Sequence, residues 1–249
     1  MFSRGVVELN ENYLYGLCLG LLSVTGGGLG LTHAYSWGLF SSHLGRGLSF
    51  LSVGLITWGS GTVVIAYFNI FNSASYPYPS VADFFYIISW PFWFLGLINL
   101  FKVTGATVNI KSVAGKFFAI LIMGLGILLS YYLLFVVARD GVFEIDTTNY
   151  LRLFLDFAYP FFDVIILITA SMLYILSAKY LGGLFKVPIL LVIVGFILNY
   201  FADMVFTYTN TLGTFYVGNW VDMIYTTAMF LISFGINLIN IPATEDHST

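Results

Sequence analysis

The sequence has very few charged residues. Only 8% of its 249 residues are Asp, Glu, Lys or Arg, whereas 59% are hydrophobic. A soluble domain has about 25% charged residues, so a soluble fold of this composition would lack a solvated surface. Lys and Arg form no run, which argues against a nucleic-acid partner. The composition therefore predicts an all-α integral membrane protein whose surroundings are the lipid bilayer.

Residues that commonly build catalytic and metal sites are also scarce. The single cysteine, Cys18, cannot form an internal disulfide or a zinc site, and we expect it to be an inert, packed thiol. His33 and His43 lack metal-ligand spacing, and no Gly-x-Ser-x-Gly motif occurs. The glycine-rich segment 26–30 lacks the Lys-Ser/Thr that ends a phosphate loop. We therefore expect no metal, no cofactor and no enzymatic activity.

Long apolar stretches are plentiful, and short polar or Gly/Pro-rich segments separate them. The stretches fall at about 12–33, 48–71, 80–101, 115–138, 150–178, 186–210 and 217–241. Each is long enough to cross about 30 Å of hydrocarbon as a helix. The sequence thus predicts a seven-transmembrane helix bundle in a single domain, residues 1–242, followed by a short polar tail, residues 243–249. Pro160 is expected to kink the fifth span or to mark where an interfacial segment turns into the membrane.

The distribution of Lys and Arg predicts the orientation of this bundle. One side holds Arg46, Lys102, Lys111, Lys116, Lys179 and Lys186, and the other holds Arg4, Arg139 and Arg152. Cytoplasmic loops have an excess of Lys and Arg. The N-terminus is therefore predicted to be extracytoplasmic and the C-terminus cytoplasmic.

Five aspartates lie inside or at the edge of the predicted spans, all toward the outer side. They are Asp83, Asp156, Asp163, Asp203 and Asp222. A charged side chain near the bilayer centre costs at least about 2.5 kcal/mol. Each carboxylate therefore needs a partner, a helix cap or water.

Three of the five have a local explanation. Ser80 precedes the third span and Asp83 stands three residues later, the spacing of a helix-capping pair. Asn219 and Asp222 repeat this arrangement before the seventh span, so structural capping is favoured over ligand chemistry for both pairs. Asp156 lies four residues after Arg152, which predicts a pair along one helix face.

Asp163 and Asp203 have no such explanation. Asn199, Asp203 and Thr207 recur every four residues, so they form a polar stripe on one helix face that should turn to the bundle interior. A ligand-binding role and a purely structural role both remain open for these residues. With nearby tyrosines they predict a polar, tyrosine-rich outer vestibule. The candidate ligand-binding residues are Tyr86, Tyr159, Asp163, Asn199, Asp203, Thr207 and Tyr225.

The third and seventh spans align without gaps. Residues 82–86 fall on residues 221–225, and Gly96 falls on Gly235. This predicts a parallel internal repeat of three helices, one linking helix and three helices. The many glycines of the first two spans indicate close helix packing inside the chain, with a dimer seam as the alternative.

Four short segments resemble a known family in their order and spacing. They are YPSVADFFY at 78–86, AYPFFD at 158–163, NYFAD at 199–203 and NWVD at 219–222. They are similar to the multi-helix membrane module at the N-terminus of bacterial diguanylate cyclases and related signalling proteins. The resemblance implies a sensor of a membrane or extracytoplasmic cue. Only seven residues follow Pro242 here, so we expect the output domain of that family to be absent from this chain.

Two functions from different classes follow. The leading hypothesis is a stand-alone, receptor-like sensor that binds a small or lipidic ligand and acts through a separate cytoplasmic signalling protein. The alternative is a small transporter or channel, since buried acids and internal repeats are typical of such proteins. The sequence does not define the oligomeric state.

Overall fold

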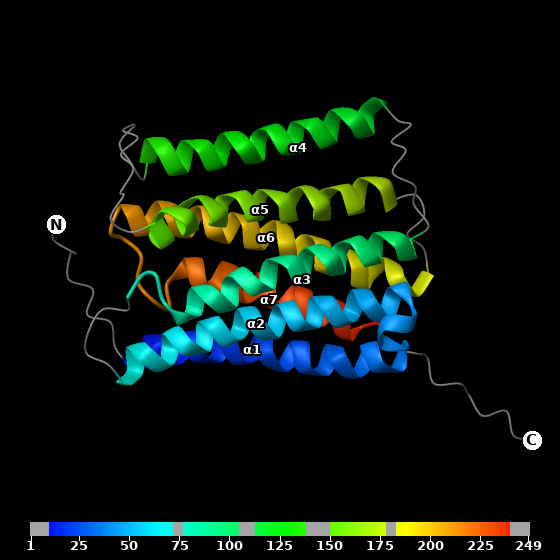
Figure 1. Cartoon of the computed structure of the whole chain (residues 1–249), viewed down its shortest axis with the longest axis horizontal. Helices are drawn as coiled ribbons and strands as arrows, with labels where there is room; N and C mark the ends of the chain where they lie inside the picture. Colours follow the sequence, from blue (N-terminus) through cyan, green and yellow to red (C-terminus); the bar gives the residue numbers. More distant parts are fainter. Residues whose placement is uncertain (1–9, 72–76, 105–112, 138–149, 178–182, 240–249) are drawn as a thin grey trace, which may run out of the picture.

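The computed structural model describes residues 10–71, 77–104, 113–137, 150–177 and 183–239, and every regular secondary-structure element within them is a helix (Figure 1). The seven predicted helices are all present. They are α1 (Asn10–Ser36), α2 (His43–Phe71), α3 (Val81–Val103), α4 (Val113–Tyr131), α5 (Tyr150–Ser177), α6 (Lys186–Thr211) and α7 (Trp220–Asn237). Two short 3-10 turns, Leu39–Ser41 and Gly183–Phe185, precede α2 and α6, and a π-helical segment, Tyr132–Val137, extends α4. The polar tail expected at 243–249 lies outside the described residues.

Six of these helices, α1 to α6, are long and apolar enough to cross a membrane. The seventh, α7, is the shortest with 18 residues. Successive helices run in opposite directions, so α1 begins and α7 ends at opposite ends of the bundle (Figure 1). This alternation is what consecutive spans joined by short connections require.

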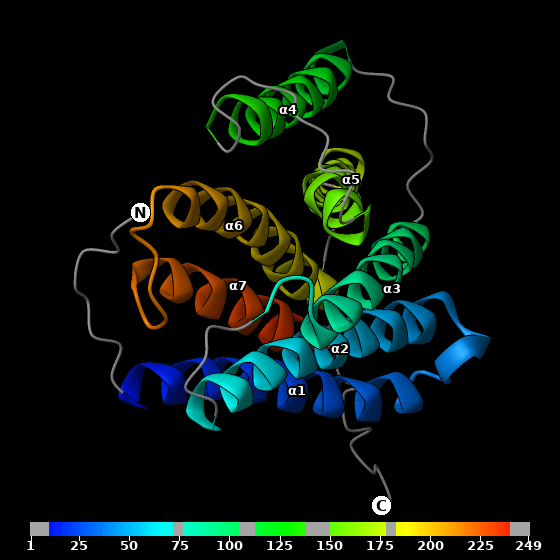
Figure 2. The same cartoon turned by 60° about the vertical axis from the view of Figure 1, so that its left-hand side comes forward.

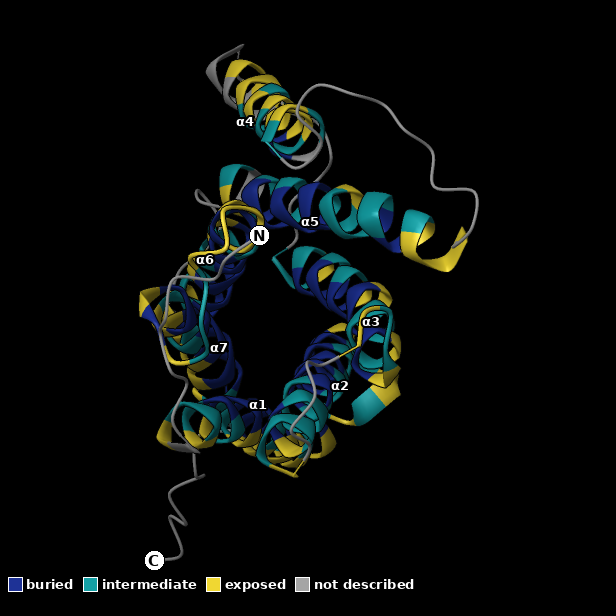
Figure 3. Cartoon of the chain, turned by 90° about the vertical axis from the view of Figure 1, so that its left-hand side faces the viewer, coloured by how far each residue is buried: buried dark blue, intermediate teal, exposed yellow. Residues whose placement is uncertain are grey.

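Six helices form a ring and one lies outside it. Figures 2 and 3 show α1, α2, α3, α5, α6 and α7 arranged around the core in that order, with α4 beyond α5. Large apolar side chains of α4 face outward, including Phe117, Ile120 and Leu128, each more than half exposed. On its inner side α4 meets α5 and α6, where the Tyr200 hydroxyl donates to the Gly126 carbonyl oxygen at 3.1 Å.

Glycines allow α1 and α2 to approach closely. A β-carbon placed on Gly20 would lie 2.9 Å from the carbonyl oxygen of Gly59, and one on Gly59 would lie 2.6 Å from that of Gly20. Contacts this short leave no space for a side chain on either helix. These two glycines therefore pack against each other within one chain.

Helix α1 also closes the ring against α7. The Asn12 side-chain amide donates to the Val217 carbonyl oxygen at 2.6 Å, and that of Asn237 donates to the Gly26 carbonyl oxygen at 2.9 Å. These bonds lie toward opposite ends of α7. They hold α1 against α7 near both ends of α7.

Of the two alternatives expected for Pro160, one is excluded, and the expectation for Cys18 was wrong. Helix α5 runs from Tyr150 to Ser177 with Pro160 inside it, so no separate interfacial segment ends at this proline. Cys18 is exposed on the outer face of α1 and is not packed. The sequence could not show which way Cys18 faces, because the outward and inward faces of an apolar span are both apolar.

Candidate functional site

The start of α3 combines a helix cap with a contact to α5. The backbone N–H of Ser80 donates to the Asp83 carboxylate at 2.7 Å, and the Ser80 hydroxyl donates to the same oxygen at 2.8 Å. The other carboxylate oxygen accepts a hydrogen bond from the Tyr159 hydroxyl at 2.7 Å. Asp83, although buried, thus caps its own helix and ties α3 to α5 through Tyr159.

The start of α7 has the equivalent arrangement. Asn219 is the N-cap, and its side-chain oxygen accepts from the backbone N–H of Val221 at 2.9 Å. The Asp222 carboxylate accepts from the backbone N–H of Gly218 at 2.6 Å. Gly218 has a positive φ of 82°, a conformation that glycine adopts without steric cost.

Asp156 lies in a third polar cluster at the same end of the bundle. Its carboxylate accepts a hydrogen bond from the Tyr78 hydroxyl at 2.9 Å. The Arg152 guanidinium lies over the Tyr78 ring, 5.8 Å from its centre. Partial burial and the negative charge of Asp156 raise the pKa of Tyr78 above its usual range, so this phenol remains a donor at physiological pH. The sequence predicted Arg152 as the neighbour of Asp156, and Tyr78 was missed.

Asp203 joins α6 to α7. One oxygen accepts from the Tyr225 hydroxyl at 2.7 Å, and the other accepts from the Asn199 side-chain amide at 2.8 Å. Asp203 is half-buried, while Tyr225 and Asn199 are buried. The polar stripe of α6 therefore faces the bundle interior, and its carboxylate receives two short hydrogen bonds there.

Two of the candidate residues form hydrogen bonds outside this group of carboxylates. The Thr207 hydroxyl donates to the backbone oxygen of Asp203 at 2.9 Å, a bond within its own helix. The Tyr86 hydroxyl lies 3.2 Å from that of Thr62 on α2. The indole of Trp58 packs between the rings of Tyr86 and Tyr225, with centroid distances of 5.8 Å and 5.9 Å. Tyr86 therefore borders the site beside Trp58, close enough to Tyr159 and Tyr225 to interact with them electrostatically.

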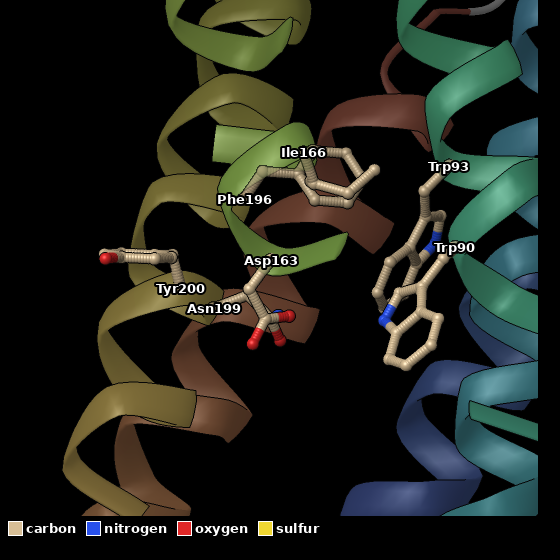
Figure 4. Close-up of a pocket in the computed structure, with 7 residues that line it drawn as sticks. All are labelled: Trp90, Trp93, Asp163, Ile166, Phe196, Asn199 and Tyr200. Carbon is tan, nitrogen blue, oxygen red and sulfur yellow. The ribbon is translucent and has the colours of Figure 1, made fainter. Parts of the chain in front are cut away.

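Asp163 lies beside a small interior cavity (Figure 4). The cavity is bounded by α3, α5 and α6, and it has about 10 Å³ available to the centre of a water-sized body. Asp163 is 7% exposed, and within the part of the chain that the structure describes no donor reaches its carboxylate. The residues that line the cavity are Trp90, Trp93, Asp163, Ile166, Phe196, Asn199 and Tyr200.

The aromatic wall of this cavity was missed by the sequence reasoning. Trp90 stacks on Phe162 with ring centroids 4.7 Å apart, and Trp93 meets Phe196 edge to face at 5.3 Å. A tryptophan in a long apolar span carries no local signal for this position, because its partners come from helices far away in sequence.

A larger hollow lies along the first half of α5. It has a volume of about 740 Å³ and is lined by Tyr150, Leu153, Phe154, Phe157, Ala158, Phe161 and Phe162. All of these residues belong to one helix, and several are exposed. In a bilayer such an open aromatic groove would meet lipid chains, so it is less selective than the polar cavity.

No group of three or more His, Cys, Asp or Glu side chains that could hold a metal ion occurs within the described ranges. Comparisons with protein-family models, curated proteins and solved structures found no match.

Proposed function

We propose that this chain is a seven-helix membrane sensor, receptor-like in organisation, that binds a small ligand among the polar residues of α3, α5, α6 and α7. The observation that carries this proposal is Asp163, a buried carboxylate without a donor at an interior cavity. Unpaired buried polar groups are expensive in an apolar interior and are typical of functional sites. Around it, Tyr159, Tyr225 and Asn199 show that hydroxyl and amide donors already bind neighbouring carboxylates.

The resemblance to the membrane modules of diguanylate cyclases supports a signalling role. Its four segments contribute to the start of α3, the middle of α5, the polar stripe of α6 and the start of α7. Asp83, Asp163, Asp203 and Asn219, the polar residues described above, come from these segments. We infer that ligand binding changes the packing of these helices and that a separate cytoplasmic protein detects the change.

The proposed internal repeat has support from equivalent contacts. Asp83 and Asp222 are each the third residue of their helix, and each accepts a backbone N–H from just before it. The donor is Ser80, the N-cap of α3, in one case and Gly218, which precedes the N-cap of α7, in the other. Gly96 packs against Leu51 of α2, and Gly235 packs against Val192 of α6, so each lies against the preceding helix. Helix α4, outside the ring, would be the linking helix between the two halves.

The orientation proposal makes the first prediction. The described basic residues Arg46, Lys102, Lys116 and Lys186 lie at the end of the bundle where α1 ends, and Arg152 lies at the other end. Reporter fusions should therefore place a domain after Thr249 in the cytoplasm and one inserted within 72–78 outside it. An external location for the first and a cytoplasmic one for the second would reverse the orientation and place the polar clusters on the cytoplasmic side.

A chimera tests the signalling proposal. A diguanylate cyclase domain attached after Thr249 should produce cyclic di-GMP. Its rate should depend on the polar residues of the proposed ligand site, such as Asp203. Asp203→Asn should change the rate at least about fivefold, which corresponds to a coupling of about 1 kcal/mol, the lower end of the usual allosteric range. Asp156→Asn is the matched control at the bundle end, and membrane levels of all variants are equalised. Equal rates for the parent and Asp203→Asn would contradict the proposal.

A transporter remains the second candidate, because an unpaired interior carboxylate can also exchange a proton or a cation during a transport cycle. Proteoliposomes separate the two functions. The sensor proposal expects no proton or ion flux above that of empty vesicles. Flux that disappears in Asp163→Asn or Asp203→Asn would make transport the better hypothesis.

A further inference from the structure

The cavity beside Asp163 has polar groups on two of its sides. Asn199 is 6% exposed, and its amide nitrogen donates to Asp203 at 2.8 Å. This bond fixes the orientation of the amide and leaves its Oδ1 atom buried without a hydrogen bond in the described structure. Figure 4 shows Asp163 and Asn199 together on one side of the cavity and the indole nitrogen of Trp90 turned toward them from the other side. Two acceptor groups and one N–H donor therefore face the same small space.

The size of this space and the chemistry of its lining limit what can occupy it. A buried polar group without a hydrogen bond is costly, whether or not it carries a charge. About 10 Å³ for the centre of a water-sized body is room for one water molecule, which needs about two to four polar partners. The rest of the lining is aromatic or aliphatic, including Ile166 and Phe196. A single water molecule, which both donates and accepts, matches this set of partners.

The polar lining is specific to one half of the proposed repeat. Thr62 of α2 hydrogen-bonds a tyrosine of α3, and Asp203 of α6 hydrogen-bonds the tyrosine that aligns with it in α7. Four residues before them stand Trp58 and Asn199, so Trp58 takes in the first half the place that Asn199 takes in the second. The Trp58 indole packs between the two tyrosine rings, whereas Asn199 presents a small amide with an unpaired oxygen atom. The polar atoms at the cavity are therefore not a by-product of the repeat.

We propose that this cavity binds one ordered water molecule, which donates to the Asp163 carboxyl group and to Asn199 Oδ1 and accepts from the Trp90 indole N–H. The water joins α3, α5 and α6, and Asn199 continues the connection through Asp203 to Tyr225 of α7. One small molecule thus connects four helices across the junction of the two halves. Because an ordered water costs little to immobilise or to release, the site stays open to exchange.

Footprinting by X-ray radiolysis of the full-length protein in detergent tests the water site. Hydroxyl radicals form from bound water as well as from bulk water, and a radical formed in a closed cavity oxidises the nearest side chains. Trp90 and Trp93, which line the cavity, should therefore be oxidised several times faster than Trp58. Their exposed fractions predict the opposite order, since Trp90 is 4% exposed, Trp93 is 1% exposed and Trp58 is 9% exposed. Mass spectrometry of the tryptophan peptides measures the rates.

Two substitutions of Asp163 provide matched variants. Asp163→Asn keeps a polar partner for the water, so the rapid oxidation of Trp90 should persist. Asp163→Leu replaces that partner with apolar atoms, so the rapid oxidation should be lost while the rate at Trp58 stays unchanged.

Two results would overturn the water site. One is oxidation of Trp90 and Trp93 in the parent protein that is no faster than that of Trp58, a comparison that requires no variant to fold. The other is rapid oxidation that persists in Asp163→Leu, since the radicals would then arrive from outside the cavity. Rapid oxidation together with a silent cyclase chimera would reject the sensor function and leave the water site standing, and the converse result would do the opposite.

Discussion

Replacing Gly27 with leucine should prevent the chain from folding, whereas the same replacement at the adjacent Gly28 should leave it folded. A β-carbon on Gly27 would lie 2.5 Å from the carbonyl oxygen of Ser52 and 2.8 Å from a side-chain carbon of Ile56, both on α2. The backbone of α2 cannot move away without separating the two helices. A β-carbon on Gly28 would have no heavy atom within 4 Å.

The pair of variants controls for helix propensity, because both positions lie inside α1 and gain the same residue. Overpacking at well-packed sites costs about 1–3 kcal/mol, and a clash with a neighbouring backbone is at the upper end or beyond. The monodisperse fraction on size exclusion and the unfolding temperature in detergent provide the measurement. Similar values for the two variants would mean that α1 and α2 do not approach as described.

Much of the fold was predictable because helix formation in an apolar chain depends on local sequence. Seven uninterrupted apolar stretches gave seven helices, and Asn219 and Ser80 stand where α7 and α3 begin. The position of α4 outside the ring was not predictable. Phe117 and Ile120 face outward and Leu133 faces inward, and in a lipid-facing helix the two faces are equally apolar, so periodicity does not distinguish them.

The sequence predicted individual polar residues of the site but not the contacts between them. The stripe of Asn199 and Asp203 indicated which face of α6 turns inward, because lipid offers no hydrogen bonds to such groups. Which residues meet there depends on packing between distant segments. Tyr159 reaches Asp83 across 76 positions of sequence, and Trp90 lines the cavity of Asp163 with no local motif to indicate it.

Asp203→Leu should be the most destabilising substitution in the polar cluster. It removes the acceptor of two short hydrogen bonds, from Tyr225 at 2.7 Å and from Asn199 at 2.8 Å. Both donors are buried, so water cannot replace the carboxylate without disturbing the packing. Each buried donor left unpaired costs about 1–3 kcal/mol, which gives about 2–6 kcal/mol for the pair.

A double-mutant cycle distinguishes this explanation from a change in packing. If the unpaired Tyr225 hydroxyl is responsible for part of the loss, Tyr225→Phe should cost less in the Asp203→Leu background than in the parent, with a coupling of about 1 kcal/mol or more. Asp156→Leu is the matched control, because its partner Tyr78 is 43% exposed and can bind water instead. Unfolding of purified protein in detergent measures all four members of the cycle. Additive losses, or an equally large loss in Asp156→Leu, would show that Asp203 does not hold α6 and α7 together through these bonds.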